Sequence, residues 1–400
     1  MSRTSGSLLL IIGMLMVGLN LRPALSGLAP VLEAVRASMG LSPGYAALLT
    51  TLPVLCLGLF APLAPILGRR FGSERVIFAF LLVLAAGIAL RSVDGPIGLF
   101  TGTVVAGASI GIIGVLLPAI VKREFAESAG TMTGVYTMAL CLGAALAAGL
   151  TVPLEGLFGG SWRPALAFWA VPALVAAGIW LPQLRRPQSA PQAMTRVRGL
   201  WRDSLAWQVT AFMGLQSSLA YIVFGWLPSI LISRGLSPLQ AGWILSASVM
   251  TQVITALLGP YLATRGRDQR LAIASFLSLS LIGLMGLLYA PMSAVWPMGL
   301  LLGLGQGATF SIAMALIVLR SPDSQTASEL SSMSQAVGFV LASLGPFAAG
   351  TLYALTGTWQ TAGALFLLIG VGALATGLGA GRARFVQPAH APETSHPTRD

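Results

Sequence analysis

The sequence is poor in charged residues and in the side chains that perform most chemistry. Only 9% of its 400 residues are charged, and no Asp or Glu falls in the middle of an apolar run. Both histidines, His390 and His396, lie in the polar C-terminal stretch, and both cysteines, Cys56 and Cys141, lie in apolar segments without CxxC spacing. This inventory excludes a metal cluster, a buried histidine relay and a disulfide framework. We therefore expect no enzyme and no cofactor.

Apolar side chains are abundant instead. They make up 56% of the chain, and the mean hydropathy is +0.84, values typical of a polytopic membrane protein. A helix of about 20 apolar residues spans the hydrocarbon core of a bilayer. Runs of about this length occur at 8–33, 44–67, 75–91, 97–121, 130–153, 164–181, 206–231, 240–263, 271–290, 294–319, 329–353 and 361–380. The sequence thus predicts an all-α membrane protein with twelve transmembrane helices.

Basic residues are scattered between these runs, so the net charge of +11 indicates membrane topology and not a nucleic-acid surface. With the N-terminus inside, most Lys and Arg residues fall in cytoplasmic connections. Those that fall outside are Arg36, Arg91, Arg163 and Arg234. The positive-inside rule therefore predicts a multi-pass protein with both termini in the cytoplasm.

A polar segment rich in Pro, Gln and Arg divides the chain. We predict an N-terminal six-helix bundle at 1–181, a cytoplasmic linker at 182–205, a C-terminal six-helix bundle at 206–380 and a disordered cytoplasmic tail at 381–400. An internal repeat supports the division, because GLSP occurs at 40–43 and again, 195 residues later, at 235–238. The same offset aligns 64–79 with 259–274. Parallel six-helix repeats place a substrate at their interface, near the middle of the membrane.

The motif NLRP, Asn20 to Pro23, lies in the middle of the first apolar run. A guanidinium at this depth costs at least ~2.5 kcal/mol. One explanation is structural: Arg22 bonds to helix carbonyls, since Pro23 lacks an N–H and leaves an acceptor free one turn earlier. The other is functional, and we favour it: Arg22 faces a water-filled cavity and binds an anionic or electron-rich solute.

Several stretches together resemble a known family. They include LRPALSGLAPVL at 21–32, LLTTLPVL at 48–55, VLLPAIVKREF at 115–125, GWLPSILISRGLS at 225–237 and LGLGQGAT at 302–309. Their combination is similar to the cyanate and 2-nitroimidazole transporter family of the major facilitator superfamily. The resemblance implies two pseudo-symmetric six-helix bundles in a bacterial inner membrane. This sequence differs from the pattern at two positions: it has Arg69 where the superfamily normally carries an Asp, and Gly114 where the family usually carries an Asn.

The resemblance also implies that the first helix of each half lines the cavity, with Arg22 as the substrate anchor. At the 195-residue offset Arg22 falls over Ser217, so we expect the anchor to face Ser217 or Gln216. The complete predicted substrate site consists of Arg22, Asn20, Gln216, Ser217, Tyr221, Gln306, Thr309 and Phe310. The alternative for these polar and aromatic residues is hydrogen bonding and packing between helices.

An inner gate is a further expectation. Arg69 replaces the usual acid beside the start of the helix predicted at 329–353, and Glu329 would neutralise that positive helix end. We predict a latch between the halves that pairs Arg69 or Arg70 with Glu329. Its repeat partner would pair Arg265 with Glu127. The alternative is that each glutamate only stabilises its own helix start.

These expectations describe a monomeric secondary transporter that moves a small polar or anionic solute by rocking its two halves. The absence of a mid-depth carboxylate disfavours a proton symporter with an acidic relay, so facilitated transport or exchange is at least as consistent with the sequence. Drug efflux is an alternative within transport, and a transporter-fold receptor without turnover is an alternative outside it. The expected partners are the small-molecule substrate and the lipid bilayer.

Overall fold

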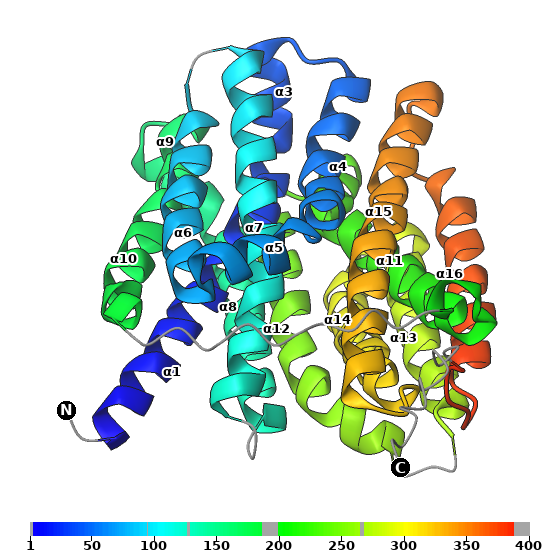
Figure 1. Cartoon of the computed structure of the whole chain (residues 1–400). Coiled ribbons are helices and arrows are strands. Elements are labelled where there is room, and N and C mark those ends of the chain that lie inside the picture. The colour runs from blue at the N-terminus through cyan, green and yellow to red at the C-terminus, as the bar shows by residue number, and fades with distance from the viewer. Residues whose placement is uncertain (1–2, 94, 126–128, 186–198, 265–267, 388–400) are drawn as a thin grey trace, which may run out of the picture.

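The computed structural model describes residues 3–93, 95–125, 129–185, 199–264 and 268–387. Within these residues the regular elements are helices (Figure 1). Those of the first half are α1 (Arg3–Asn20), α2 (Pro23–Ser26), η1 (Ala29–Val31), α3 (Leu32–Met39), α4 (Pro43–Phe60), α5 (Leu63–Phe71), α6 (Ser73–Leu90), α7 (Pro96–Glu124), α8 (Ala129–Leu157), α9 (Trp162–Ala167) and α10 (Ala170–Trp180).

Short 3-10 turns, η3 (Leu181–Arg185) and η4 (Leu200–Arg202), precede the second half. Its elements are α11 (Ser204–Ser233), α12 (Pro238–Thr264), α13 (Arg270–Tyr289), η5 (Met292–Ala294), α14 (Val295–Leu319), α15 (Ser324–Thr356) and α16 (Ala362–Ala380). Twelve helical stretches of the described chain are long and apolar enough to cross a membrane. The predicted all-α class and the number of spans are thus confirmed.

The repeated GLSP segment builds the same turn in both halves. Gly40 and Gly235 both have positive φ angles, 60° and 100°, which glycine adopts without strain. The following serines then cap the next helix. The Ser42 hydroxyl accepts a hydrogen bond from the Tyr45 amide, and the Ser237 hydroxyl accepts one from the Gln240 amide. The repeat therefore encodes a helix start, at α4 and at α12.

A second pair of equivalent positions lies at the opposite end of the bundle. Glu74 lies in the first turn of α6 and forms an ion pair with Arg123 at the end of α7. At the 195-residue offset Glu74 corresponds to Gln269, whose side-chain oxygen accepts from Arg320 at the end of α14. Arg320 also donates to the Ala380 carbonyl, over 2.8 Å. The two halves thus tie the same helices together, one with a charged acceptor and one with a neutral acceptor.

Three of the predicted spans are interrupted. The first divides into α1, α2, η1 and α3, the second divides between α4 and α5 next to Pro62, and the sixth divides between α9 and α10. The number of spans in the described chain stays twelve, because each interruption falls within one predicted run. Proline explains two of the interruptions, because it removes a backbone donor and clashes with the preceding turn.

The two halves meet through small residues. Helix α4 packs against α15, and α8 packs against α12. A Cβ atom on Gly242 would lie 2.6 Å from the Ala148 carbonyl oxygen, and one on Gly350 would lie 2.5 Å from the Ala47 Cβ. Glycine at these two positions therefore permits the helices of opposite halves to approach closely.

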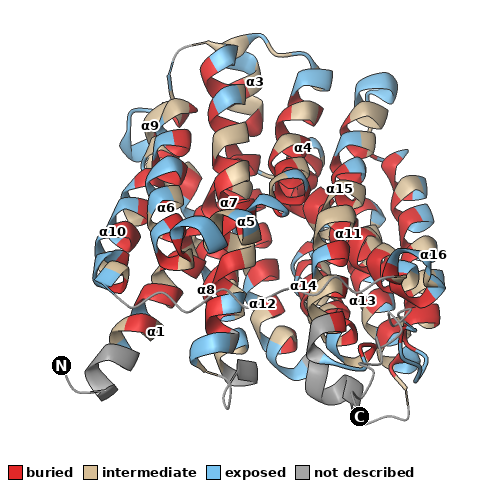
Figure 2. Ribbon diagram, viewed as in Figure 1, coloured by how far each residue is buried: buried red, intermediate tan, exposed pale blue. Residues whose placement is uncertain are grey.

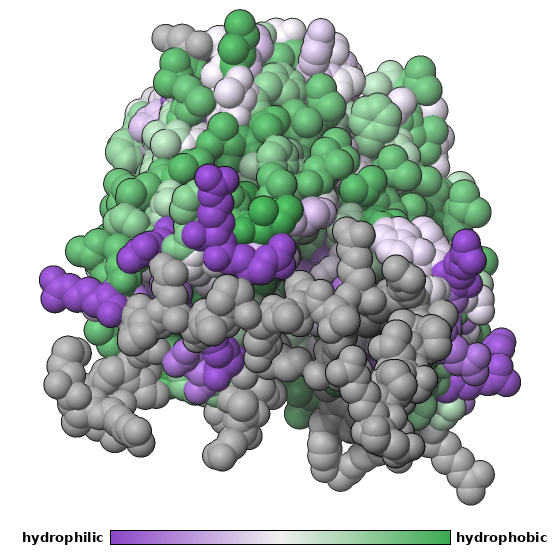
Figure 3. All heavy atoms as spheres, viewed as in Figure 1, coloured by the Kyte–Doolittle hydropathy of each residue, from purple (hydrophilic) through white to green (hydrophobic). Residues whose placement is uncertain are grey.

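The surface has the character of a membrane protein. Figure 2 shows buried positions along the helix faces that meet other helices and exposed positions on the outward faces. Large apolar side chains such as Ile97, Leu355 and Leu368 are exposed on those outward faces. In Figure 3 apolar residues cover most of the upper part of the visible face, while hydrophilic residues gather lower down. Lipid, and not water, suits this outer surface.

The start of α1 and the end of α16 both lie in the lower part of Figure 1. The segment after α16, predicted to be disordered, is partly bound. The Val386 amide donates to the Arg320 carbonyl, and the Gln387 amide donates to the Asp203 carboxylate. Residues 388–400 and the central part of the predicted linker, 186–198, lie outside the described residues.

Candidate functional site

The first span is broken where the sequence carries Arg22 and Pro23. Helix α1 ends at Asn20, and α2 starts at Pro23, with Arg22 in the N-cap position. The Arg22 carbonyl accepts from the Leu25 and Ser26 amides, at 2.9 Å and 3.1 Å, so the new helical segment begins at Arg22 itself. Proline is favoured at the first position of a helix, because an N–H at that position would have no partner within the helix.

The break leaves the Leu19 carbonyl without an amide donor, since the donor of a continuous helix would be the N–H that Pro23 lacks. Helix α8 covers this carbonyl with Gly143. A Cβ atom at Gly143 would lie 1.9 Å from the Leu19 oxygen, closer than any side chain could come. The glycine thus lets the α8 backbone contact the exposed turn of α1, in a Cα–H to oxygen contact.

A second carbonyl is free at the other end of α2. Because α2 ends at Ser26, the Ala24 carbonyl has no amide partner at Leu28. Arg91, the residue that follows α6, fills this gap: its Nη1 donates to the Ala24 oxygen over 2.7 Å. The sequence places Arg91 in a connection between two spans, and in the structure it directly follows the end of α6 at Leu90. Its side chain turns into the bundle and is 2% exposed.

Arg22 projects its guanidinium toward the other half of the molecule. The guanidinium carbon lies 5.3 Å from the centroid of Phe224 and 5.9 Å from that of Tyr221, both on α11. No ion pair of the described residues includes Arg22. Cation–π contact of this kind contributes about 0.5–2 kcal/mol, more when water is excluded. It compensates only part of the cost of placing a charge at this depth.

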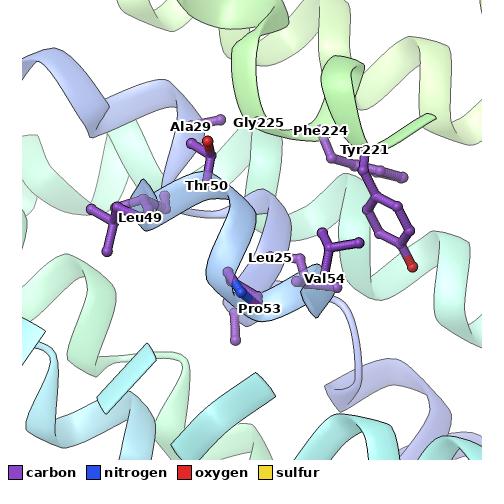
Figure 4. A pocket seen from close by; sticks show the side chains of 11 residues that line it. Leu25, Ala29, Leu49, Thr50, Pro53, Val54, Tyr221, Phe224 and Gly225 are labelled. Atoms are coloured by element: carbon purple, nitrogen blue, oxygen red, sulfur yellow. The ribbon is translucent and has the colours of Figure 1, made fainter. Parts of the chain in front are cut away.

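The two aromatic residues also line a pocket between the broken segment, α4 and α11 (Figure 4). Its lining is mostly apolar, with the hydroxyl groups of Thr50 and Tyr221 as the polar contribution. It comprises Ala24, Leu25, Leu28, Ala29, Leu49, Thr50, Pro53, Val54, Tyr221, Phe224 and Gly225. Small-molecule sites are commonly of this kind, an apolar cleft with a few placed polar groups.

The predicted partners on α11 lie one to two turns away from the position that faces Arg22. Gln216 and Ser217 are buried and bond to each other, with the Gln216 amide donating to the Ser217 hydroxyl over 2.8 Å. The amide also donates to the Met213 carbonyl over 3.2 Å. In this conformation both side chains are satisfied within their own helix. Of the α11 residues predicted to line the site, Tyr221 is the one that contacts the anchor.

The α14 candidates form a separate polar cluster with α12. The Gln306 side-chain oxygen accepts from Gln252, at 3.3 Å, and its amide donates to the Leu219 carbonyl, at 3.5 Å. The Thr309 hydroxyl bonds to carbonyls of its own helix, those of Gly305 and Gln306. Both residues are buried, and in this conformation Gln306 joins α14 to α12 and α11.

Two further candidates lie apart from the pocket. The Asn20 amide donates to the Met16 and Pro172 carbonyls, which directs the side chain toward α10 and away from α11. Phe310 is partly buried and packs against the apolar core. Neither residue contacts Arg22 among the described interactions.

The residues of the predicted latch are placed only in part, because Arg265 and Glu127 lie outside the described residues. Arg70 covers the ring of Phe71 at 5.2 Å, in the last turn of α5 with Arg69. The ion pairs described at this end join Arg123 to Glu74 and Glu124 and do not include Glu329.

Glu329 also lies deeper in its helix than the sequence indicated. Helix α15 begins at Ser324, and Asp323 caps it by accepting from the Thr326 amide over 2.8 Å. Glu329 is therefore in the second turn, where the helix dipole acts less on it. The latch stays a prediction.

Sequence reasoning missed several residues around the anchor. Phe224 follows Tyr221 by three positions, so the helical period places both on one face of α11, and this spacing could have revealed it. Thr50 lies in the LLTTLPVL stretch, three residues before Pro53, and a polar side chain in that apolar stretch could also have been noticed. Arg91 and Gly143 carry no local signal, because their roles depend on contacts with a distant helix.

A helical bundle of this topology, with a charged residue at a broken helix near its centre, is the architecture of a membrane carrier. The Major Facilitator Superfamily profile matches residues 8–342 and 220–400. The chain is 41% identical to the 2-nitroimidazole transporter of Escherichia coli (strain K12), over 88% of this chain and 90% of that one.

It is also 30% identical to the cyanate transport protein CynX of the same organism, over 94% and 97% of the two chains. In structure it is similar to a D-xylose-proton symporter, with a TM-score of 0.70 at 14% identity over 94% and 98% of the two chains. The chain belongs to the major facilitator superfamily and, within it, to the group of the cyanate and 2-nitroimidazole transporters. It is a transporter and not an enzyme.

Proposed function

We propose that this protein moves a small anionic or electron-rich planar solute, similar to cyanate or 2-nitroimidazole, across the membrane by alternating access, with Arg22 as the anchor. The observation that carries the proposal is the state of Arg22. In the described spans it is the one charge located away from the span ends, it lies at a helix break, and it faces the opposite half without a counter-ion.

The chemistry of the site suits such a solute. A guanidinium offers several N–H donors in a planar fork, and this geometry matches nitro and carboxylate-like groups. The aromatic residues beside it, Tyr221 and Phe224, present faces on which a flat solute can stack. Leu25, Leu49 and Val54 form an apolar wall of the pocket. This wall excludes water from the solute and carries no charge that would compete with Arg22 for it.

The anchor also bears on coupling. Arg22 belongs to the first half, and its aromatic contacts belong to the second half. A solute bound between them therefore contacts both halves at once, and its binding energy differs between the conformations that separate the halves. No mid-span carboxylate is present in the described spans to carry a proton. We propose facilitated transport or exchange in place of an acidic proton relay.

The test is thermal stabilisation of the purified protein by 2-nitroimidazole, potassium cyanate, a small carboxylate and a neutral sugar, followed by uptake into proteoliposomes. A ligand that binds the folded state raises its stability according to its concentration over its dissociation constant. We expect Arg22→Ala to weaken binding of the active solute by about 10- to 100-fold, since hydrogen bonds to a charged group contribute ~1.5–3 kcal/mol.

Arg36→Ala is the matched control, because Arg36 lies in the same span and is already paired with Glu33 over 2.7 Å. Its ligand response should equal that of the wild type. Equal responses of the wild type and Arg22→Ala would contradict the anchor. A preference for large apolar cations in this panel would instead favour drug efflux.

The inner latch remains part of the proposal. Glu329→Lys would repel Arg69 and Arg70 in the conformation that brings them together, and so shift the population toward the inward-open state. Accessibility labelling of single cysteines on the two sides of the membrane measures that shift. An unchanged labelling pattern would exclude the latch.

A further inference from the structure

The burial of Arg91 costs free energy that side-chain packing alone does not offset. Its guanidinium is fully buried among helices, and no ion pair of the described residues includes it. An arginine guanidinium is not deprotonated in proteins, so the side chain is charged. A buried charge without a counter-ion opposes folding, and it persists only where another requirement holds it in place.

The contacts of Arg91 identify that requirement. Its Nη1 donates to the Ala24 carbonyl, whereas Nε and Nη2 are buried without a hydrogen-bond partner among the described residues. Among the described residues the side chain therefore makes one polar contact, and that contact is with α2. Gly102 provides the room, since a Cβ there would lie 2.9 Å from the Arg91 Cγ.

The position of α2 determines the position of Arg22. Ala24 lies two residues after Arg22, and the Leu25 and Ser26 amides bond back to the Arg22 carbonyl. The Ser26 hydroxyl ties the same segment to the Ala144 carbonyl of α8, over 2.9 Å. A segment of four residues between two breaks has no rigidity of its own, so its orientation depends on these external bonds.

We propose that Arg91 is a positioning residue for the solute site: by holding the Ala24 carbonyl it fixes α2, and through α2 it directs Arg22 toward Tyr221 and Phe224. The inference rests on the proposed role of Arg22 as anchor. It assigns a part in solute affinity to a residue that follows the third span and does not itself line the pocket.

The experiment compares Arg91→Met and Arg91→Lys with the wild type and Arg22→Ala. Dissociation constants for 2-nitroimidazole and cyanate are measured by isothermal titration, and the thermal midpoint is measured without ligand. Met keeps the volume of the buried side chain and removes the charge, whereas Lys keeps a cationic donor for the Ala24 carbonyl. Arg320→Met is the matched control, because Arg320 is also a buried arginine that bonds to carbonyl groups, but at the far end of the other half.

We expect Arg91→Met to weaken solute binding about tenfold, within the range of ordinary coupling between sites, while the ligand-free thermal midpoint stays the same or rises. Arg91→Lys should recover part of the affinity. Arg320→Met should lower the midpoint and leave the affinity unchanged. If Arg91→Met yields no folded protein, Arg91→Gln takes its place, and its dissociation constants and thermal midpoint are compared with those of Arg91→Lys.

Two results would overturn the inference. One is wild-type affinity in Arg91→Met while Arg22→Ala has lost binding, and in that case the anchor stands and the positioning role falls. The other is a parallel loss of stability and affinity that Arg91→Lys does not restore, which would make Arg91 a residue of the fold alone. If the wild type and Arg22→Ala respond alike, the proposed function itself fails, and the inference falls with it.

Discussion

The first spans of the two halves occupy equivalent places in the repeat. They differ in the residues at the middle of the span. In the first half the positions are Arg22 and Pro23, and the span breaks there. At the 195-residue offset the second half has Ser217 and Ser218, and α11 continues without interruption from Ser204 to Ser233. A serine keeps its backbone N–H, so the ladder of hydrogen bonds is complete there, whereas Pro23 removes one donor from it.

The comparison teaches that a duplicated fold can hold an asymmetric site. The broken helix exposes two carbonyl groups, and the first half covers them with Gly143 and Arg91. The continuous helix keeps its backbone N–H donors at Ser217 and Ser218 and presents aromatic rings to the break. One half thus contributes a charge and the other contributes the surface that receives it.

The largest effect should follow from closing the space that the break requires. Gly143→Ala would place a Cβ atom 1.9 Å from the Leu19 oxygen, a backbone atom that cannot move aside without shifting α1. Such overpacking costs typically 1–3 kcal/mol and more against a rigid backbone. We expect a marked loss of monodisperse protein in fluorescence-detected size exclusion. Gly178→Ala is the control, since no atom lies within 4 Å of its added Cβ.

Restoring the missing N–H is the next test of the comparison. Pro23→Ala supplies a donor for the Leu19 carbonyl, and Ala is ~3 kcal/mol more favourable than Pro inside a helix. We expect a ligand-free thermal midpoint no lower than that of the wild type, with solute affinity reduced about tenfold, or ~1.4 kcal/mol, because Arg22 then follows a continuous helix. Pro228→Ala serves as control, since α11 already continues through Pro228.

A different result would change the reading of the break. If Pro23→Ala bound the solute as the wild type does, the break would be held by Gly143 and Arg91 and not by the proline. Measuring the affinities of Pro23→Ala and Gly143→Ala, alone and combined with Arg91→Met, separates these contributions. The free-energy changes of residues that act together are not additive.

Much of the fold could be predicted from the sequence because it depends on local properties. Spans of about 20 apolar residues are recognisable by composition alone. The GLSP repeat encodes a left-handed glycine and a serine cap, both properties of a few adjacent residues. The interruption after Asn20 was harder to place, since proline also occurs inside unbroken helices, as Pro53 does in α4.

The site was predicted less completely, for a physical reason. Arg22 and Tyr221 were selected because a charge in an apolar run and a polar aromatic stand out in a single segment, and the structure places these two side chains in contact. The alignment of the repeat placed Ser217 opposite the anchor, but in this structure the contact falls on Tyr221 and Phe224. The break changes the course of one helix and not the other, so equal sequence positions no longer lie at equal places.

The smallest expected effect concerns solute shape. Phe224→Leu keeps the apolar volume of the pocket but removes the ring beside Arg22. An aromatic pair contributes ~0.5–1.5 kcal/mol beyond its buried area, so 2-nitroimidazole should bind about 3- to 10-fold more weakly, measured by isothermal titration. Cyanate has no ring to stack, so the fold-change in its dissociation constant should be less than half of that for 2-nitroimidazole.

Phe310→Leu is the control for the same measurement, because Phe310 packs against the core and makes no described contact with Arg22. An equal loss for both solutes in Phe224→Leu would mean that the ring only holds the guanidinium in place. An equal loss in Phe310→Leu would instead restore α14 to the site, and with it the view that both first helices and the tenth span converge on the solute.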